Sequence, residues 1–215
     1  MSAVPLCLLA TAILVWAERA RIMGVRAVTK TVASLAFVLA AVQAGSLDAG
    51  VAGLALLVAL GLSVVGDLLL LSRARPAFLG GLGAFLLAHV AFVATFLTLA
   101  PDPRIAAVAA VPVAAVCAGV WRWLSPRAGS MGGPVLAYVV VIGAMTATSF
   151  GLAARSPWVP VAAVVFLLSD LCVARDRFVS PGWENRLVGL PLYYGAQLLF
   201  AWAIPMVALD VTSGP

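Results

Sequence analysis

The sequence lacks the charged residues that a soluble protein of its size carries. Of its 215 residues, 10% are charged and 64% are hydrophobic, whereas a soluble domain carries about 25% charged residues. Too little polar surface remains to cover a globule in water, which excludes a soluble fold. The basic residues are scattered rather than clustered, so the net charge of +5 does not indicate nucleic acid as a partner.

Metal-binding and disulfide patterns are also missing. The chain has one histidine and three cysteines, Cys7, Cys117 and Cys172, which lie singly within apolar runs. They show neither CxxC nor Cys/His spacing and are interpreted as small hydrophobic core residues. We therefore expect no disulfide framework, no metal and no cofactor.

Long apolar runs are what the sequence has in abundance. A run of about 18 or more apolar residues can cross the bilayer core as a helix, and the runs lack the alternation of a membrane barrel. The sequence predicts an all-α fold, a polytopic membrane bundle of eight transmembrane helices forming one domain over residues 1–215. The expected spans are 2–17, 30–45, 50–71, 77–99, 104–123, 131–152, 157–174 and 187–209.

The basic residues sort to one side of these spans. Arg104 and Arg155 fall on one side, and the other eleven fall in or beside the loops after the first, third, fifth and seventh spans. Basic loops stay in the cytoplasm, so we expect a multi-pass protein of the cell membrane with both termini outside. The eleven are Arg19, Arg21, Arg26, Lys30, Arg73, Arg75, Arg122, Arg127, Arg175, Arg177 and Arg186.

A weak internal similarity joins the two halves of the chain. Residues 65–68 (VGDL) and 168–171 (LSDL) each precede a pair of arginines at the end of a span. One interpretation is a parallel repeat of two four-helix halves. The other is that helices leaving the membrane toward the cytoplasm commonly end in arginines.

A few polar side chains lie within the spans, where an ionisable group is costly and marks a functional site. Asp67 and Asp170 lie about one and a half turns from the cytoplasmic ends of their helices and so share one depth. Two acids at one depth can divide into an acid and a base, as hydrolysis requires. We expect one pocket, open toward the cytoplasm, that gathers Asp67, Asp170, Lys30 (at the start of its span), His89, Tyr138, Tyr193, Tyr194 and Gln197.

Structural roles for these residues remain open. Asp67 could form an ion pair with Lys30 or Arg73, and Asp170 one with Arg175. His89 could be an interhelical hydrogen-bonding residue. The two tyrosines, Tyr193 and Tyr194, could belong to an interfacial aromatic belt.

Three stretches resemble the YhhN-type lysoplasmalogenase family. They are GDLLLL at 66–71 followed by FLGGLGAFLLAH at 78–89, FLLSD at 166–170, and YYGAQLL at 193–199. Lys30 also fits, and the resemblance covers about residues 30–205. The chain departs from the family pattern at Thr31, where proline is frequent, and at Phe92, where tyrosine is frequent. The resemblance implies hydrolysis of the vinyl ether of lysoplasmalogens, giving a fatty aldehyde and a glycerophospho-base, with Asp67 and Asp170 essential.

These observations lead to two hypotheses. In the first, one aspartate, assigned as Asp170, protonates the vinyl ether, and Asp67 stabilises the cation and activates water; the reverse assignment is open. Tyr193, Tyr194 and Gln197 orient these groups, and Lys30 attracts the phosphate or tunes an aspartate. The partners are then a lysophospholipid substrate and membrane lipid, with no obligate protein partner. In the second, the protein is a transporter or lipid-binding protein with a proton- or cation-linked carboxylate pocket.

Overall fold

The computed structural model describes residues 2–72 and 74–212, and Arg73, one of the basic residues counted above, lies outside them. Within these ranges the chain is helical and contains no strand, so the all-α prediction is confirmed. The helices are α1 (Ala3–Ala20), α2 (Met23–Gln43), α3 (Gly50–Leu69), α4 (Arg75–Thr98), α5 (Pro103–Ala128), α6 (Gly132–Phe150), α7 (Trp158–Phe178) and α8 (Trp183–Thr212). A short 3-10 helix, η1 (Gly129–Met131), joins α5 to α6.

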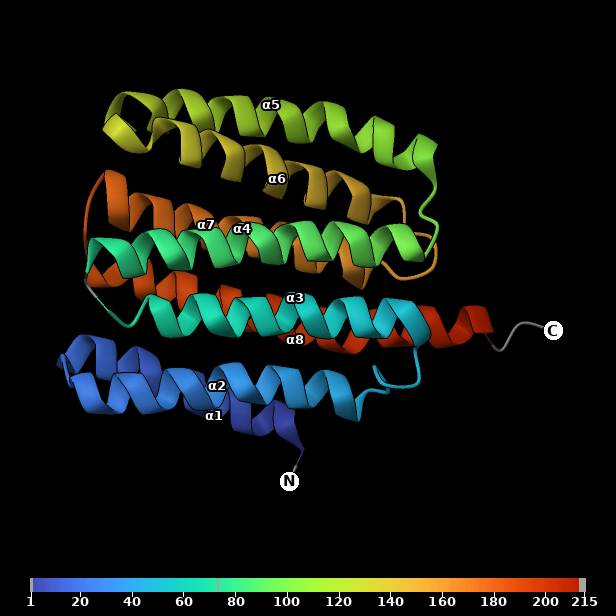
Figure 1. Cartoon of the computed structure of the whole chain (residues 1–215), viewed down its shortest axis with the longest axis horizontal. Helices are drawn as coiled ribbons and strands as arrows, with labels where there is room; N and C mark the ends of the chain where they lie inside the picture. Colours follow the sequence, from blue (N-terminus) through green and yellow to red (C-terminus); the bar gives the residue numbers. More distant parts are fainter. Residues whose placement is uncertain (1, 73, 213–215) are drawn as a thin grey trace.

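Seven helical stretches among the described residues are long and apolar enough to cross a membrane. One of them is Pro103–Phe150, in which α5, η1 and α6 are taken together. The chain reverses at η1, so α5 and α6 lie side by side in opposite directions (Figure 1). This content of apolar helices identifies a multi-pass membrane protein.

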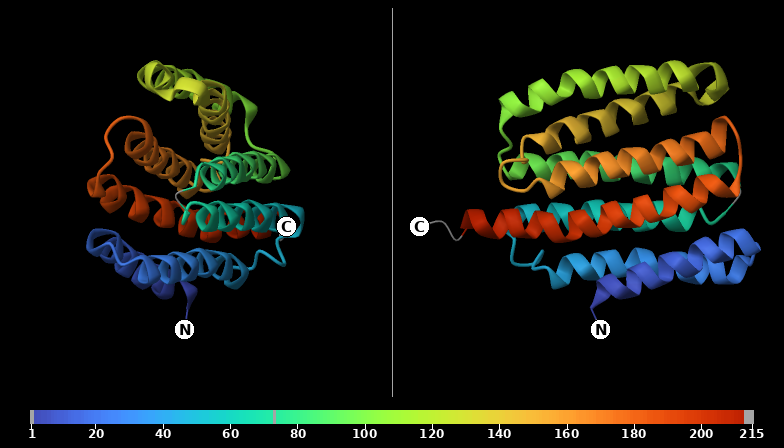
Figure 2. Two further views of the ribbon diagram at one scale, coloured as in Figure 1. Left: turned by 60° about the vertical axis from the view of Figure 1, so that its left-hand side comes forward. Right: turned by 180° about the vertical axis from the view of Figure 1, so that it is seen from behind.

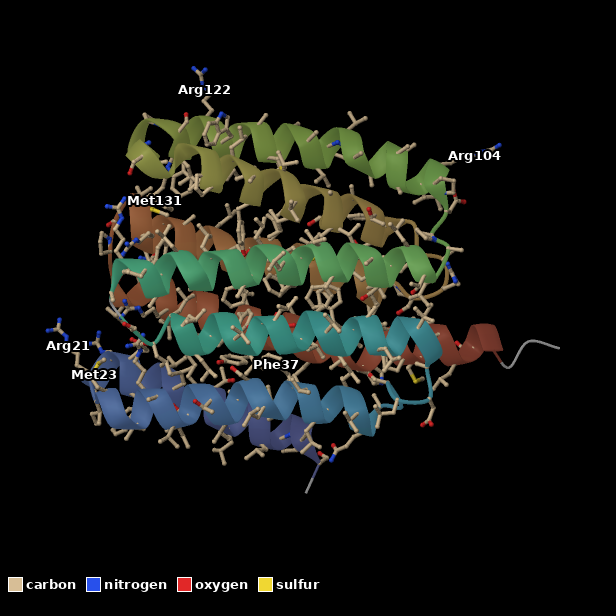
Figure 3. The ribbon with its side chains drawn as sticks, in the orientation of Figure 1. Arg21, Met23, Phe37, Arg104, Arg122 and Met131 are labelled. Atoms are coloured by element: carbon tan, nitrogen blue, oxygen red, sulfur yellow. The ribbon has the colours of Figure 1, made fainter. Side chains whose placement is uncertain are left out.

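The helices lie roughly parallel and form three groups (Figures 1 and 2). Helices α5 and α6 form one edge, α1 and α2 form the other, and α3, α4, α7 and α8 lie between them. Helix α8 packs against α1, α2, α3 and α7. Its Phe200 ring also lies against Phe92 of α4, with ring centroids 4.6 Å apart. Arg21 projects from one end of the bundle and Arg104 from the opposite end, and Arg122 points outward from the side of α5 in the half nearer Arg21 (Figure 3). We call the end at Arg21 the basic end.

Local sequence explains how the elements next to the site begin and pack. Asp102 caps α5 by accepting hydrogen bonds from the backbone N–H groups of Arg104 and Ile105, at 2.8 and 3.3 Å, and Pro103 occupies the first helical position, where its missing N–H is harmless. Gly66 lets α4 approach α3. A Cβ there would lie 2.6 Å from Cε2 of Phe85, so a larger residue would push the helices apart beside Asp67.

Several predicted boundaries were wrong at the basic end. Helix α2 begins at Met23 rather than at residue 30, α7 continues to Phe178 rather than 174, and α8 begins at Trp183 rather than 187. Lys30 therefore lies two turns inside α2, not at its start. The helices continue through these charged residues because the charges are paired with side chains of neighbouring helices. Arg26, for example, pairs with Glu18 of α1 at 2.6 Å.

Candidate active site

A cavity of about 530 Å³ opens inside the bundle, and both Asp67 and Asp170 line it. Residues from all the helices α1–α8 contribute to its wall. Of the other residues singled out in the sequence, Lys30, Tyr138 and Tyr193 line it as well. His89, Tyr194 and Gln197 lie behind this first layer and contact it from within the bundle. The two carboxylates have different neighbours.

Asp67 lies in a cluster that also contains Lys30, Ser34 and Tyr193, here called the Asp67 cluster. Its side chain is almost completely buried and pairs through Oδ1 with Lys30 Nζ at 3.1 Å. Its Oδ2 accepts a hydrogen bond from Tyr193 OH at 2.7 Å and lies 2.7 Å from Ser34 Oγ. Ser34 Oγ is also 2.9 Å from the Lys30 carbonyl oxygen. Helices α2, α3 and α8 thus meet at one buried carboxylate.

Tyr194 and Gln197 support this cluster from behind. Tyr194 OH lies 3.2 Å from Ser34 Oγ and 3.4 Å from the Lys30 carbonyl oxygen. Gln197 Nε2 donates to Tyr193 OH at 3.2 Å. Tyr193 is 6% exposed and Tyr194 is fully buried, so the aromatic-belt interpretation was wrong for both. Their hydroxyl groups form hydrogen bonds inside the bundle.

Asp170 lies in a second cluster with Tyr138 and His89, here called the Asp170 cluster. Tyr138 OH donates to Asp170 Oδ2 at 2.8 Å, and His89 Nε2 lies 3.5 Å from the same oxygen. No lysine or arginine pairs with Asp170 in the part of the chain that the structure describes. The alternative of an ion pair with Arg175 was wrong, because Arg175 donates to Asn185 at 2.5 Å and lies 3.8 Å from Glu184.

The hydrogen bond at the other ring nitrogen fixes the tautomer of His89. Nδ1 lies 2.6 Å from the carbonyl oxygen of Phe85, one turn earlier in α4, so the bond is within the helix rather than between helices. A carbonyl oxygen can only accept, so Nδ1 carries a proton. In the neutral ring Nε2 is then an acceptor, and it has no hydrogen-bond partner among the described residues. This lone pair faces Asp170, and the imidazole ring makes edge-on contacts with the rings of Tyr138 and Phe166.

Two further regions of the cavity wall differ in character. Along α5 and α6 it is largely apolar, and we call this part the apolar arm. It is lined by Val116, Cys117, Val120, Leu124, Val135, Val139 and Ile142.

At the basic end the wall is charged, and we call this part the mouth; it contains Glu18, Arg26, Asp176, Arg177 and Arg186. Glu18 accepts from Arg26 at 2.6 Å and from Arg186 at 2.8 Å. Arg186 also lies 3.4 Å from Asp176.

Comparison with known proteins places the chain in a family. Residues 25–204 match the model of the YhhN family. The chain belongs to the YhhN family. Proteins named lysoplasmalogenase from Mycobacterium bovis and Mycobacterium tuberculosis are each 38% identical over 167 residues, which is 73% of this chain and 58% of theirs. The human protein named Lysoplasmalogenase TMEM86B is 33% identical over 137 residues, 64% of this chain and 57% of its own.

The chain therefore spans less than two thirds of the length of these YhhN-family relatives. No solved structure matches. The matched region includes both aspartates and the α8 residues Tyr193, Tyr194 and Gln197.

Sequence reasoning did not find every polar residue of this YhhN-family site. It missed Ser34, although Ser34 follows Lys30 by four residues and so shares its face of α2. It also missed the mouth, because Glu18 and Asp176 lie near helix ends, where charged side chains are common.

Within residues 2–72 and 74–212, no group of three or more His, Cys, Asp or Glu side chains is placed to hold a metal ion.

Proposed function

We propose that the protein is a membrane-embedded hydrolase that cleaves the alkenyl ether bond of lysoplasmalogen-type lysophospholipids. The observation that carries this proposal is a single cavity that joins two carboxylates to a charged mouth and an apolar arm. The relatives named lysoplasmalogenase support the same reaction for this chain.

The charged and apolar parts of the cavity match the headgroup and the hydrocarbon chain of a single-chain phospholipid. The guanidinium groups of Arg26, Arg177 and Arg186 lie at the mouth, and guanidinium is well suited to a phosphate. The apolar arm suits a hydrocarbon chain. A lysolipid with its headgroup at the mouth and its chain in the arm would hold its ether linkage inside the cavity that Asp67 and Asp170 line.

The surroundings of the two aspartates suggest different roles. Asp67 is held as the anion of a buried ion pair with Lys30, which suits stabilisation of a positive intermediate. Asp170 Oδ2 faces the lone pair of His89 Nε2, and two acceptors face each other favourably only when a proton lies between them. We therefore assign one shared proton to the Asp170–His89 pair and assign Asp170 as the general acid, with His89 as its positioning residue.

The chemistry then proceeds in two stages. Asp170 gives its proton to the β-carbon of the vinyl ether, the C=C π bond breaks, and an oxocarbenium ion forms beside the Asp67 carboxylate. Water adds to the α-carbon and loses a proton, which restores the acid. The resulting hemiacetal collapses to a fatty aldehyde and the glycerophospho alcohol, so one water molecule is consumed for each ether bond broken. Glycosidases also place two carboxylates around an oxocarbenium-like transition state, but there the acid protonates the leaving oxygen rather than a carbon.

The proposed membrane arrangement has eight crossings, because α5 and α6 reverse at η1 and each is long enough to span the core. The basic end, marked by Arg21 (Figure 3), faces the cytoplasm, and both termini lie outside. The mouth then opens toward the cytoplasm. A reporter enzyme that is active only outside the cytoplasm, fused to the C-terminus, tests this: activity is expected, and its absence would reverse the orientation.

The direct test is release of fatty aldehyde from a lysoplasmalogen by the purified wild-type protein, with Asp67→Asn and Asp170→Asn as variants. Aldehyde from the wild type and none above background from either variant is the expected result. If folded variants retain wild-type rates, two-aspartate catalysis is wrong. If the wild type releases no aldehyde but moves lysolipid or a cation across vesicle membranes, the transporter hypothesis replaces the hydrolase.

A further inference from the structure

Helix α5 is the least covered helix of the bundle. Among the described residues it packs only against α6, α7 and the η1 turn, and Leu124 and Ala128 are its only buried residues. Val108 and Val111 are more than 70% exposed, and Figure 2 shows α5 as the outermost helix at its edge. An apolar helix with so much uncovered surface faces the hydrocarbon of the membrane. The gap between α5 and α7 is thus a boundary between the protein interior and lipid.

A groove of about 430 Å³ follows this boundary. Helix α5 contributes Val116, Gly119, Val120 and Trp123, and helix α7 contributes Leu171, Cys172 and Arg175. Four of these residues, Val116, Val120, Leu171 and Cys172, also line the cavity that contains the two aspartates. The groove therefore adjoins the cavity along the gap between the two helices.

The depth of the groove in the membrane follows from the residues at its two ends. Trp123 and Arg175 are of the types that mark the interface between lipid and water. Val116 lies seven residues before Trp123 in the same helix, which places it about 10 Å along the helix axis. The groove thus runs from the interface at the basic end into the hydrocarbon layer, which is the region occupied by the upper part of a lipid chain.

We propose that this groove is a lateral entrance through which the hydrocarbon chain of a single-chain lipid passes from the membrane into the carboxylate cavity. This rests on the proposed function, whose substrate is such a lipid. A hydrocarbon chain that reached the cavity from water would have to expose all its methylene groups to water, which costs free energy. Passage through the gap between α5 and α7 keeps the chain in apolar surroundings. The headgroup would travel along the interface, past Arg175 toward the mouth.

Gly119 offers a clean way to close the entrance. It is exposed and lines the groove, and a Cβ at this position would meet nothing within 4 Å, so a large side chain can be added without a clash at the backbone. Gly133 in α6 is the matched control. It is also exposed and helical, a Cβ there also meets nothing within 4 Å, and it lines neither the groove nor the cavity.

The experiment uses photolabelling, which requires no turnover. The full-length protein in vesicles is exposed to a lysophospholipid that carries a diazirine midway along its single chain, and labelled peptides are located by mass spectrometry. We expect label on the α5 and α7 segments in the wild type and in Gly133→Trp. In Gly119→Trp the label there should fall roughly tenfold, because the chain loses its apolar groove. Gly119→Leu makes the same prediction and replaces Gly119→Trp if that variant does not fold, because a Cβ at this position meets nothing within 4 Å.

The outcomes separate this proposal from the proposed hydrolase function. Label lost in Gly119→Trp and retained in Gly133→Trp supports the entrance, even if the wild type releases no aldehyde and the hydrolase proposal fails. Label that is unchanged in Gly119→Trp, or that falls equally in both variants, overturns the entrance, even if aldehyde release is normal. A wild type that is labelled only outside α5 and α7 overturns it as well.

Discussion

Asp67 and Asp170 line one cavity, yet they are held in opposite ways. Asp67 has an ammonium partner at 3.1 Å and two hydroxyl groups within 2.7 Å of its other oxygen. Asp170 has one hydroxyl donor at 2.8 Å and an imidazole nitrogen at 3.5 Å that presents a lone pair. Its side chain is also more exposed, at 18% against 3% for Asp67.

This contrast indicates what each carboxylate can do. A proton added to Asp67 would leave Lys30 as an uncompensated charge in the bundle, so Asp67 is suited to remain a fixed anion. Asp170 has no such cation to balance among the described residues, so it can give up and regain a proton without breaking an ion pair. The Asp67 cluster should therefore contribute mainly to the stability of the fold, and the Asp170 cluster mainly to the reaction.

The largest effect is expected for Asp67→Asn. Removing one partner of a buried ion pair costs about 3–5 kcal/mol, so the free energy of unfolding in mixed micelles should fall by that amount, with loss of activity. The double variant Lys30→Met/Asp67→Asn removes both charges and should recover most of the stability. A single variant as stable as the wild type would contradict a structural role for the ion pair.

Asp170→Asn should affect activity and leave the fold intact. Loss of a general acid lowers the rate by about 10²–10⁴-fold, while the free energy of unfolding should stay close to that of the wild type. Aldehyde release and thermal unfolding in the same detergent measure the two quantities. Asp48→Asn, the same change at an exposed position, is the control. The contrast fails if Asp170→Asn unfolds the protein as Asp67→Asn is expected to do.

The sequence predicted that both aspartates line one pocket, as they do, but it did not assign the other polar side chains to one aspartate or the other. Both aspartates precede arginines near the end of an apolar run, and helical rise predicts a common depth for them. Which side chains surround them depends on how α2 and α8 pack on α3, and on how α4 and α6 lie beside α7. These contacts join residues far apart in the sequence, from 32 positions for Tyr138 and Asp170 to 126 for Asp67 and Tyr193, and no local pattern encodes them.

The helix ends illustrate a second limit of sequence reasoning. A run of apolar residues predicts a span well, but it places the end of the helix at the first charge. Arg26 and Lys30 lie inside α2 because Glu18 and Asp67 neutralise them. These partners come from α1 and α3, so the true start of α2 follows from tertiary structure rather than from composition. The same holds for Arg177, which continues α7 while its guanidinium lies 3.9 Å from the centre of the Phe78 ring.

A pair of tyrosine variants compares the clusters with matched chemistry. Tyr193→Phe and Tyr138→Phe each remove one hydroxyl that donates to an aspartate Oδ2, at 2.7 and 2.8 Å. A hydrogen bond to a charged group contributes about 1.5–3 kcal/mol. We expect Tyr193→Phe to lower the free energy of unfolding by that amount. Tyr138→Phe should instead lower aldehyde release, by roughly tenfold or more, with a smaller change in stability. Equal effects on stability would mean that both tyrosines are structural.

The smallest effect is expected for Ser34→Ala. Ser34 Oγ lies near two acceptors, Asp67 Oδ2 at 2.7 Å and the Lys30 carbonyl oxygen at 2.9 Å, but a hydroxyl has a single proton to share between them. Asp67 also keeps Lys30 and Tyr193 in the variant, so the free energy of unfolding should fall by only about 0.5–1.5 kcal/mol, and activity should persist.

Ser63→Ala is the control for this variant, because Ser63 is equally buried and donates at 3.0 Å only to the carbonyl oxygen of Ala59 in its own helix. The difference between the two serine variants isolates the contact with the carboxylate. If Ser34→Ala destabilises the protein as much as Tyr193→Phe, the serine proton points to Asp67 and the carboxylate depends on all three donors. If the two serine variants are equal, the proton points to the carbonyl oxygen of Lys30, and the lysine and tyrosine alone hold Asp67 in place.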